Sequence, residues 1–143
     1  MQKKAFFESV SRSLQCDAQR AEGLTLAVFQ QLRDRLTPKE AADVAAQLPA
    51  GLKPLWQDNE RRDRRVEKVH REEFLGRIRR FAGLPDDAEA ERSVKVVFAA
   101  LQALLGSPTG KEGEAWHIFS QLPKDLKELW LEAGAEHDGT QRR

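Results

Sequence analysis

The chain has 143 residues, of which 40% are hydrophobic and 33% are charged, and 24 basic against 23 acidic residues leave a net charge of +1. These values predict one globular domain over residues 1–143 and argue against intrinsic disorder. The single cysteine, Cys16, excludes an intramolecular disulfide and favours a reducing cytoplasm. We expect neither a signal peptide nor a membrane span, because the most apolar stretch, residues 94–105, is too short to cross a bilayer.

The first half of the chain has the pattern of four helices. The first is predicted over residues 3–14, and the second starts after Asp17, whose carboxylate can cap its N-terminus. The third opens at Thr37 with a Thr-Pro-x-Glu capping box and ends before Pro49, because proline disfavours helical geometry in the residue that precedes it. The fourth carries a Leu-x-x-Leu-Trp face, and Pro54 predicts that this helix is short, begins late, and is frayed or 3₁₀.

The second half repeats this pattern. Gln-Leu-Pro at residues 47–49, and the Leu, Leu and Trp that follow it, recur 74 residues later, and apolar residues of the first two helices recur at offsets of 68 and 69. Equivalent helices are expected over residues 71–82, with Phe81 on the apolar face, then after Asp86 and after Thr109. The two units cover about residues 2–57 and 70–133. A charged linker is expected at about 58–69, and the tail 134–143 is expected to be loose.

Tandem units with Gln-Leu-Pro between two helices, followed by Leu-x-x-Leu-Trp, resemble a small prokaryotic family known only as a domain of unknown function. The resemblance covers nearly the whole chain and implies a helical fold without an activity. Together with the repeat, it predicts an all-α domain of about eight helices. In this fold a duplicated four-helix unit packs about a pseudo-two-fold axis as one helical bundle.

Few residues have a pattern that indicates catalysis or metal binding. Two Glu-x-x-His pairs, Glu67/His70 and Glu114/His117, have the spacing of a metal-binding helix, but the apolar stripes carry no further carboxylates, so we interpret these histidines as solvated. Cys16 is interpreted as a small buried hydrophobic residue rather than a reactive thiol. The sequence therefore predicts no catalytic residue, no metal site and no cofactor, and an enzyme is the least favoured class.

Two tryptophans and a basic segment are the candidate contact residues. Trp56 and Trp130 occupy equivalent positions, where core packing is the ordinary role, and a groove beside them between the two halves is the candidate surface for a protein partner. Nine basic against six acidic residues give residues 58–80 a net charge of +3, which could attract phosphates. The arginines of this segment are Arg61, Arg62, Arg64, Arg65, Arg71, Arg77, Arg79 and Arg80.

The leading hypothesis is a non-enzymatic, cytoplasmic interaction or regulatory module with an unidentified protein partner. The alternative is a nucleic-acid-associated protein that uses the segment from Arg61 to Arg80, although its acidic residues dilute the positive charge. A protein partner is favoured over nucleic acid, and the sequence leaves the oligomeric state open.

Overall fold

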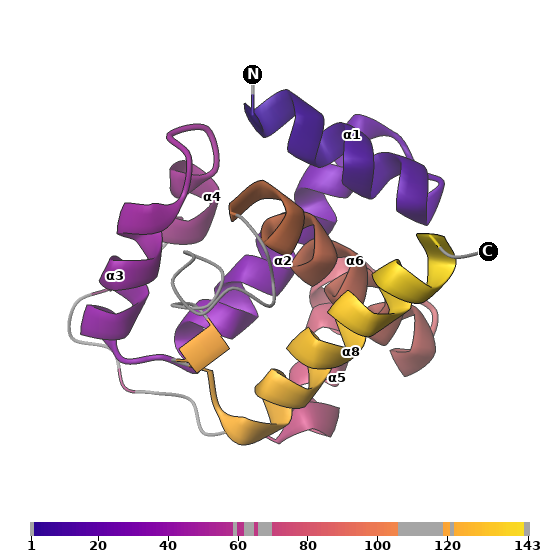
Figure 1. The fold of residues 1–143 in the computed structure, drawn as a ribbon. Helices are drawn as coiled ribbons and strands as arrows, with labels where there is room; N and C mark the ends of the chain where they lie inside the picture. Colours follow the sequence, from indigo (N-terminus) through magenta and orange to yellow (C-terminus); the bar gives the residue numbers. More distant parts are fainter. Residues whose placement is uncertain are drawn as a thin grey trace.

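A computed structural model describes residues 2–58, 60–61, 65, 70–105, 119–120 and 122–141, and these residues form seven helices and no strand (Figure 1). The described part of the chain is therefore all-α, as predicted. The helices are α1 (Gln2–Leu14), α2 (Ala18–Asp34), α3 (Pro38–Gln47), α4 (Lys53–Gln57), α5 (Arg71–Ala82), α6 (Asp87–Leu105) and α8 (Lys124–Gln141). Most of the helix predicted after Thr109 and most of the predicted linker lie outside the described residues. Of that helix, Phe119 and Ser120 are described, and both are helical.

Local capping chemistry accounts for several helix ends. The Asp17 carboxylate accepts a hydrogen bond from the N–H three residues later at 2.7 Å, and Asp86 does the same before α6 at 2.9 Å. Thr37 and Glu40 form a reciprocal capping box at the start of α3. Each interaction pairs an N–H that the first turn of a helix leaves without an intrahelical acceptor. These predicted starts are confirmed.

The turn from α3 to α4 follows from two prolines. Leu48 has extended geometry (φ −82°, ψ 147°), so α3 ends before Pro49 as predicted. Helix α4 is five residues long and begins at Lys53, which confirms the prediction of a short, late helix. The prediction of a frayed or 3₁₀ segment is wrong. Pro54 lies in the first turn of a regular α-helix, where a missing N–H removes no intrahelical hydrogen bond.

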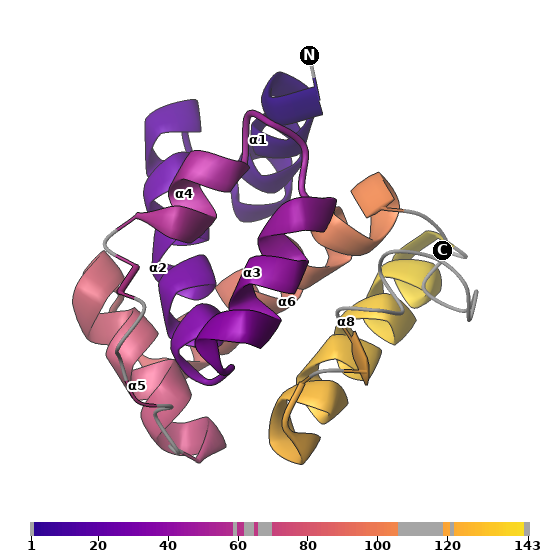
Figure 2. The ribbon, with the colours of Figure 1, turned by 90° about the vertical axis from the view of Figure 1, so that its left-hand side faces the viewer.

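Two long helices, α2 and α6, form the centre of the packing. Helix α1 packs against both of them, and so does α5. Helix α4 packs on α2, whereas α8 packs on α6, and Figure 2 shows α4 and α8 on opposite sides of the molecule. The largest fully buried side chains form one cluster between these elements, namely Trp56, Trp130, Phe29, Phe74, Phe98, Leu32, Leu36, Leu52, Ile78, Leu101 and Leu126.

Three sequence predictions differ from the structure. Phe81 is 55% exposed, because it lies at the edge of the apolar stripe of α5 and Ala82 takes the buried position. Cys16 is only partly buried, at the turn between α1 and α2. The tail is not loose from residue 134, because α8 continues to Gln141.

The continuation of α8 depends on Gly134. A glycine inside a helix costs only about 1 kcal/mol, which does not stop a helix that is packed on a neighbour. A Cβ atom at this position would lie 3.0 Å from Oε1 of Gln102, so glycine allows α8 to approach α6 closely. Gly134 is therefore a packing residue rather than a helix end.

Candidate functional site

Trp56 and Trp130 are core residues in the structure. Trp56 is 1% exposed, its ring packs edge-on against Phe29 with centroids 5.6 Å apart, and its indole N–H donates to the Ala41 carbonyl at 2.8 Å. Trp130 is 2% exposed and its ring centroid lies 5.1 Å from that of Phe98. Their rings are buried against Phe29 of α2 and Phe98 of α6, so neither side chain is exposed to a partner. A contact surface beside them stays a prediction. Both tryptophans have the core-packing role that was the ordinary alternative.

Two buried polar side chains that the sequence analysis missed support these tryptophans. Nη1 of Arg33 on α2 donates to the Trp56 carbonyl at 3.0 Å, and Nε2 of Gln102 on α6 donates to the Trp130 carbonyl at 3.0 Å. The signal that could have identified them is their spacing, because residues 33 and 102 are 69 apart and each lies within an apolar stripe.

Arg33 also holds the chain where it leaves α4. Its guanidinium, in a side chain only 5% exposed, donates to the Asp58 carbonyl and lies 3.2 Å from Asp34 and 3.7 Å from Glu60. A cation is favourable at a helix C-terminus, where the last carbonyls carry partial negative charge. Gln102, at the corresponding place on α6, is neutral. Helix α8 continues past Trp130 to Gln141, so there is no helix C-terminus at this point for a cation to stabilise.

Part of the positive charge of the basic segment is paired with carboxylates, as far as the structure describes this segment. Three of its arginines lie within 2.9–3.2 Å of carboxylates, with Arg71 on Glu91 and Glu132, Arg77 on Glu73, and Arg79 on Asp87. Arg61, Arg65 and Arg80 are exposed, while Arg62 and Arg64 lie outside the described residues. The carboxylate partners offset the positive charge that would attract a phosphate backbone.

Four charged side chains form a network that joins α5, α6 and α8. Arg71 bridges Glu91 at 2.9 Å and Glu132 at 3.2 Å, and Lys95 contacts the same two carboxylates at 3.0 and 3.3 Å. The hydrogen bonds from Arg71, supported by Lys95, hold the pKa of Glu91 and of Glu132 below the ordinary value of a glutamate. The network thus favours the charged form of both carboxyl groups in the folded protein.

This network predicts a loss of stability in acid. A carboxyl group whose pKa is lowered by folding stabilises the fold above its unfolded-state pKa, and this contribution disappears as the pH falls through the folded-state value. Both carboxylates are partly exposed, so each pair contributes no more than about 1 kcal/mol. We expect the unfolding free energy of Arg71→Met to fall less than that of the parent chain between neutral pH and about pH 3. Urea denaturation at several pH values measures this, with Arg80→Met as the matched control, and an unchanged profile would contradict the assignment.

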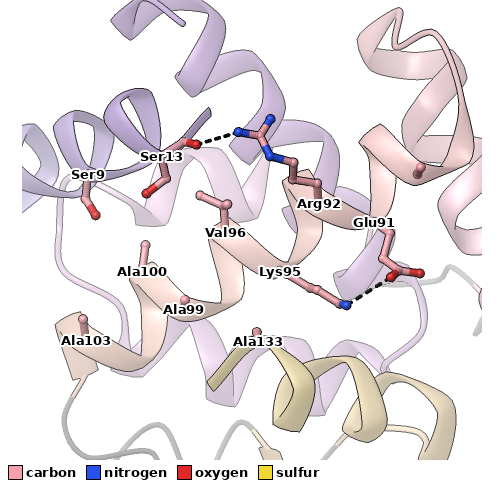
Figure 3. A pocket seen from close by; sticks show the side chains of 11 residues that line it. Ser9, Ser13, Glu91, Arg92, Lys95, Val96, Ala99, Ala100, Ala103 and Ala133 are labelled. Carbon is pink, nitrogen blue, oxygen red and sulfur yellow. Dashed lines mark hydrogen bonds and ion pairs between the residues drawn. The ribbon is translucent and has the colours of Figure 1, made fainter. Parts of the chain in front are cut away.

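A groove lies between α1, α6 and α8, and we call it the α6 groove. It has a volume of about 540 Å³ (Figure 3). Small side chains of α6 form its floor, with Ser9 and Ser13 of α1 along one side and Ala133 of α8 along the other. The residues contributed by α6 are Ala88, Glu91, Arg92, Lys95, Val96, Ala99, Ala100 and Ala103.

The other predicted candidates lie apart from this groove. His70 lines a second pocket of about 330 Å³ beside the ion pair of Arg35 and Asp125, while Glu67, Glu114 and His117 lie outside the described residues. Within the residues that the structure covers, no three His, Cys, Asp or Glu side chains are grouped to hold a metal ion. In the same part of the chain, none of the helices combines the length and the apolar character needed to span a membrane.

Comparison with known proteins agrees with the family resemblance seen in the sequence. No protein among the curated ones matches this chain. A family whose description is "Uncharacterized conserved protein (DUF2267)" matches residues 3–129, which include α1 without its first residue, α2 to α6, and the first six residues of α8. The chain therefore belongs to this family of uncharacterized conserved proteins.

Proposed function

We propose that this protein is a non-enzymatic, cytoplasmic interaction module that binds a partner protein in the α6 groove. The observation that carries the proposal is the groove itself, which has a volume of about 540 Å³ and is lined by residues of three helices. Its floor is mainly alanine and valine, and apolar surface of this kind in a concave site gains free energy when a partner covers it.

A role in binding rather than catalysis agrees with the charges of the groove. Acid–base catalysis needs a group that can gain or lose a proton near neutral pH. Glu91 is held in its charged form by Arg71 and Lys95, which lowers its pKa, and Lys95 lies between two carboxylates. The only cysteine, Cys16, has its pKa raised by partial burial, which disfavours the nucleophilic thiolate.

We further propose that the module consists of two copies of one four-helix unit related by a pseudo-two-fold axis. The helix contacts support this, because α1 packs on α2 and α6, while its counterpart α5 packs on α6 and α2. The tryptophans support it as well. Each packs against a phenylalanine of the long helix in its own half, and each main-chain carbonyl accepts from Arg33 or Gln102 at the same distance of 3.0 Å.

Three residues that line the α6 groove differ from their counterparts in the other proposed copy. At the offsets of 68 and 69, Ser13 of α1 corresponds to Phe81 of α5, Ala99 of α6 corresponds to Gln30 of α2, and Ala103 corresponds to Asp34. In each pair the residue that lines the groove is the smaller one. These smaller side chains at Ser13, Ala99 and Ala103 leave room in the groove, and this supports a specialised role for it.

Photo-crosslinking in the native cell tests the proposed module. We expect a benzophenone side chain at Ala99 to capture one protein reproducibly, because that position lies on the floor of the groove. The same group at Ala42, an exposed residue of α3, serves as the matched control and is expected to capture none. Equal capture at both positions, or none at Ala99, would contradict a binding role for the groove.

A further inference from the structure

We infer that the α6 groove takes one face of an amphipathic helix from the partner, with large apolar side chains on the groove floor and an acidic residue opposite Arg92. This inference rests on the proposed function and names the chemistry of the partner.

The length of the groove fits a helix. Its lining runs along α6 from Ala88 to Ala103, and 15 residues of helix rise about 22 Å, which is four turns. A compact small molecule would fill only part of this length. Helices α1 and α8 border the floor on both sides, as Figure 3 shows, so a further helix laid along it would place its side chains between three helices.

The floor suits large apolar side chains. Val96, Ala99, Ala100 and Ala103 of α6, with Ala133 of α8, provide apolar surface but little bulk. Small residues on one helix allow close approach by large residues on the next, in the same way that ridges pack into grooves. An aromatic or leucine side chain of the partner would supply that bulk.

The charges at one end of the groove favour an acidic residue on the partner. Lys95 and Glu91 are engaged with each other at 3.0 Å within the network. Arg92 differs, because its side chain is 45% exposed and its contact to Glu89 is long, at 3.5 Å. The other terminal nitrogen of Arg92 donates to the Ser13 carbonyl, which holds the guanidinium at the edge of the groove (Figure 3). A fixed guanidinium at the rim is suited to a paired hydrogen bond with a carboxylate.

Two helical peptides of about 16 residues test this inference with the full chain. Both carry leucine and phenylalanine along one face, and they differ only in glutamate or lysine beside that face. We expect fluorescence anisotropy to show saturable binding of the glutamate peptide, and at least about tenfold weaker binding of the lysine peptide. Arg92→Glu should reverse this preference. Ala99→Trp, which fills the groove, should abolish binding, whereas Ala42→Trp should leave it unchanged.

Circular dichroism and thermal unfolding show whether each variant retains its fold. Failure of both peptides to bind, equal affinity for the two, or binding that survives Ala99→Trp would overturn the inference. A concentration-dependent dimer in ultracentrifugation that Ala99→Trp dissolves would assign the groove to a second copy of the chain and would also overturn it. If the crosslink at Ala99 persists while the peptides fail, the interaction module stands and only the helical partner is wrong.

Discussion

Replacing Trp56 with alanine is expected to lower the free energy of unfolding by about 4 kcal/mol, which is within the usual range for truncating a buried tryptophan. The side chain is almost fully buried and packs against Phe29. Its removal leaves a cavity at the junction of α2 and α4 and also removes the hydrogen bond to the Ala41 carbonyl. Urea denaturation with linear extrapolation measures the change.

Two further variants make this experiment specific. Trp56→Phe keeps an aromatic ring but loses the indole N–H, so its expected cost is smaller, at about 1–2 kcal/mol from the lost hydrogen bond together with the lost volume. Trp130→Ala should destabilise to a similar extent as Trp56→Ala, because Trp130 is equally buried and packs on Phe98. A loss below about 1 kcal/mol for either alanine variant would show that the site collapses around the cavity.

Arg33→Met is expected to cost about 3 kcal/mol, although methionine has a similar length and is more apolar. Removing the guanidinium leaves the buried Trp56 carbonyl and the partly buried Asp58 carbonyl without their donor. The carboxylates of Asp34 and Glu60 lose a cation as well, but they are partly exposed and water can replace part of that contact.

Arg33→Gln is the informative comparison. Gln102 donates to the Trp130 carbonyl from the corresponding place on α6, so a glutamine at residue 33 should restore one of the lost hydrogen bonds. We expect it to recover about 1 kcal/mol relative to methionine. If methionine and glutamine were equally destabilising, the two buried polar residues would not be interchangeable donors. If methionine matched the parent chain, the buried arginine would contribute nothing to stability.

The helix boundaries could be predicted where local chemistry decides them. The caps at Asp17 and Thr37 and the stop at Pro49 involve residues within a few positions of the helix end, so the sequence contains all of the information. The apolar stripes of α1 and α2 could be predicted for the same reason, because helical periodicity alone places their residues on one face.

Features that depend on contacts between distant residues could not be predicted in this way. Gly134 is a helix breaker by local propensity, and only the proximity of Gln102 explains its place inside α8. The exposure of Phe81 and the burial of Arg33 depend on what packs against α5 and α2. The α6 groove is formed by three helices, and periodicity within one helix does not reveal the space beside it. The sequence therefore predicted the helical faces but not the groove beside α6.

The reciprocal packing of the first helices has a consequence for how the protein acquires its structure during synthesis. Helix α1 needs α6 and helix α2 needs α5 to complete the core, and the interacting segments are separated by about half of the chain. Ribosomes add about 5–20 residues per second, so synthesis of α5 and α6 takes several seconds after the first four helices are complete. During this time the apolar faces of the first four helices stay exposed. We expect the N-terminal half alone to be a poor folding unit and to depend on chaperones or on rapid completion of the chain.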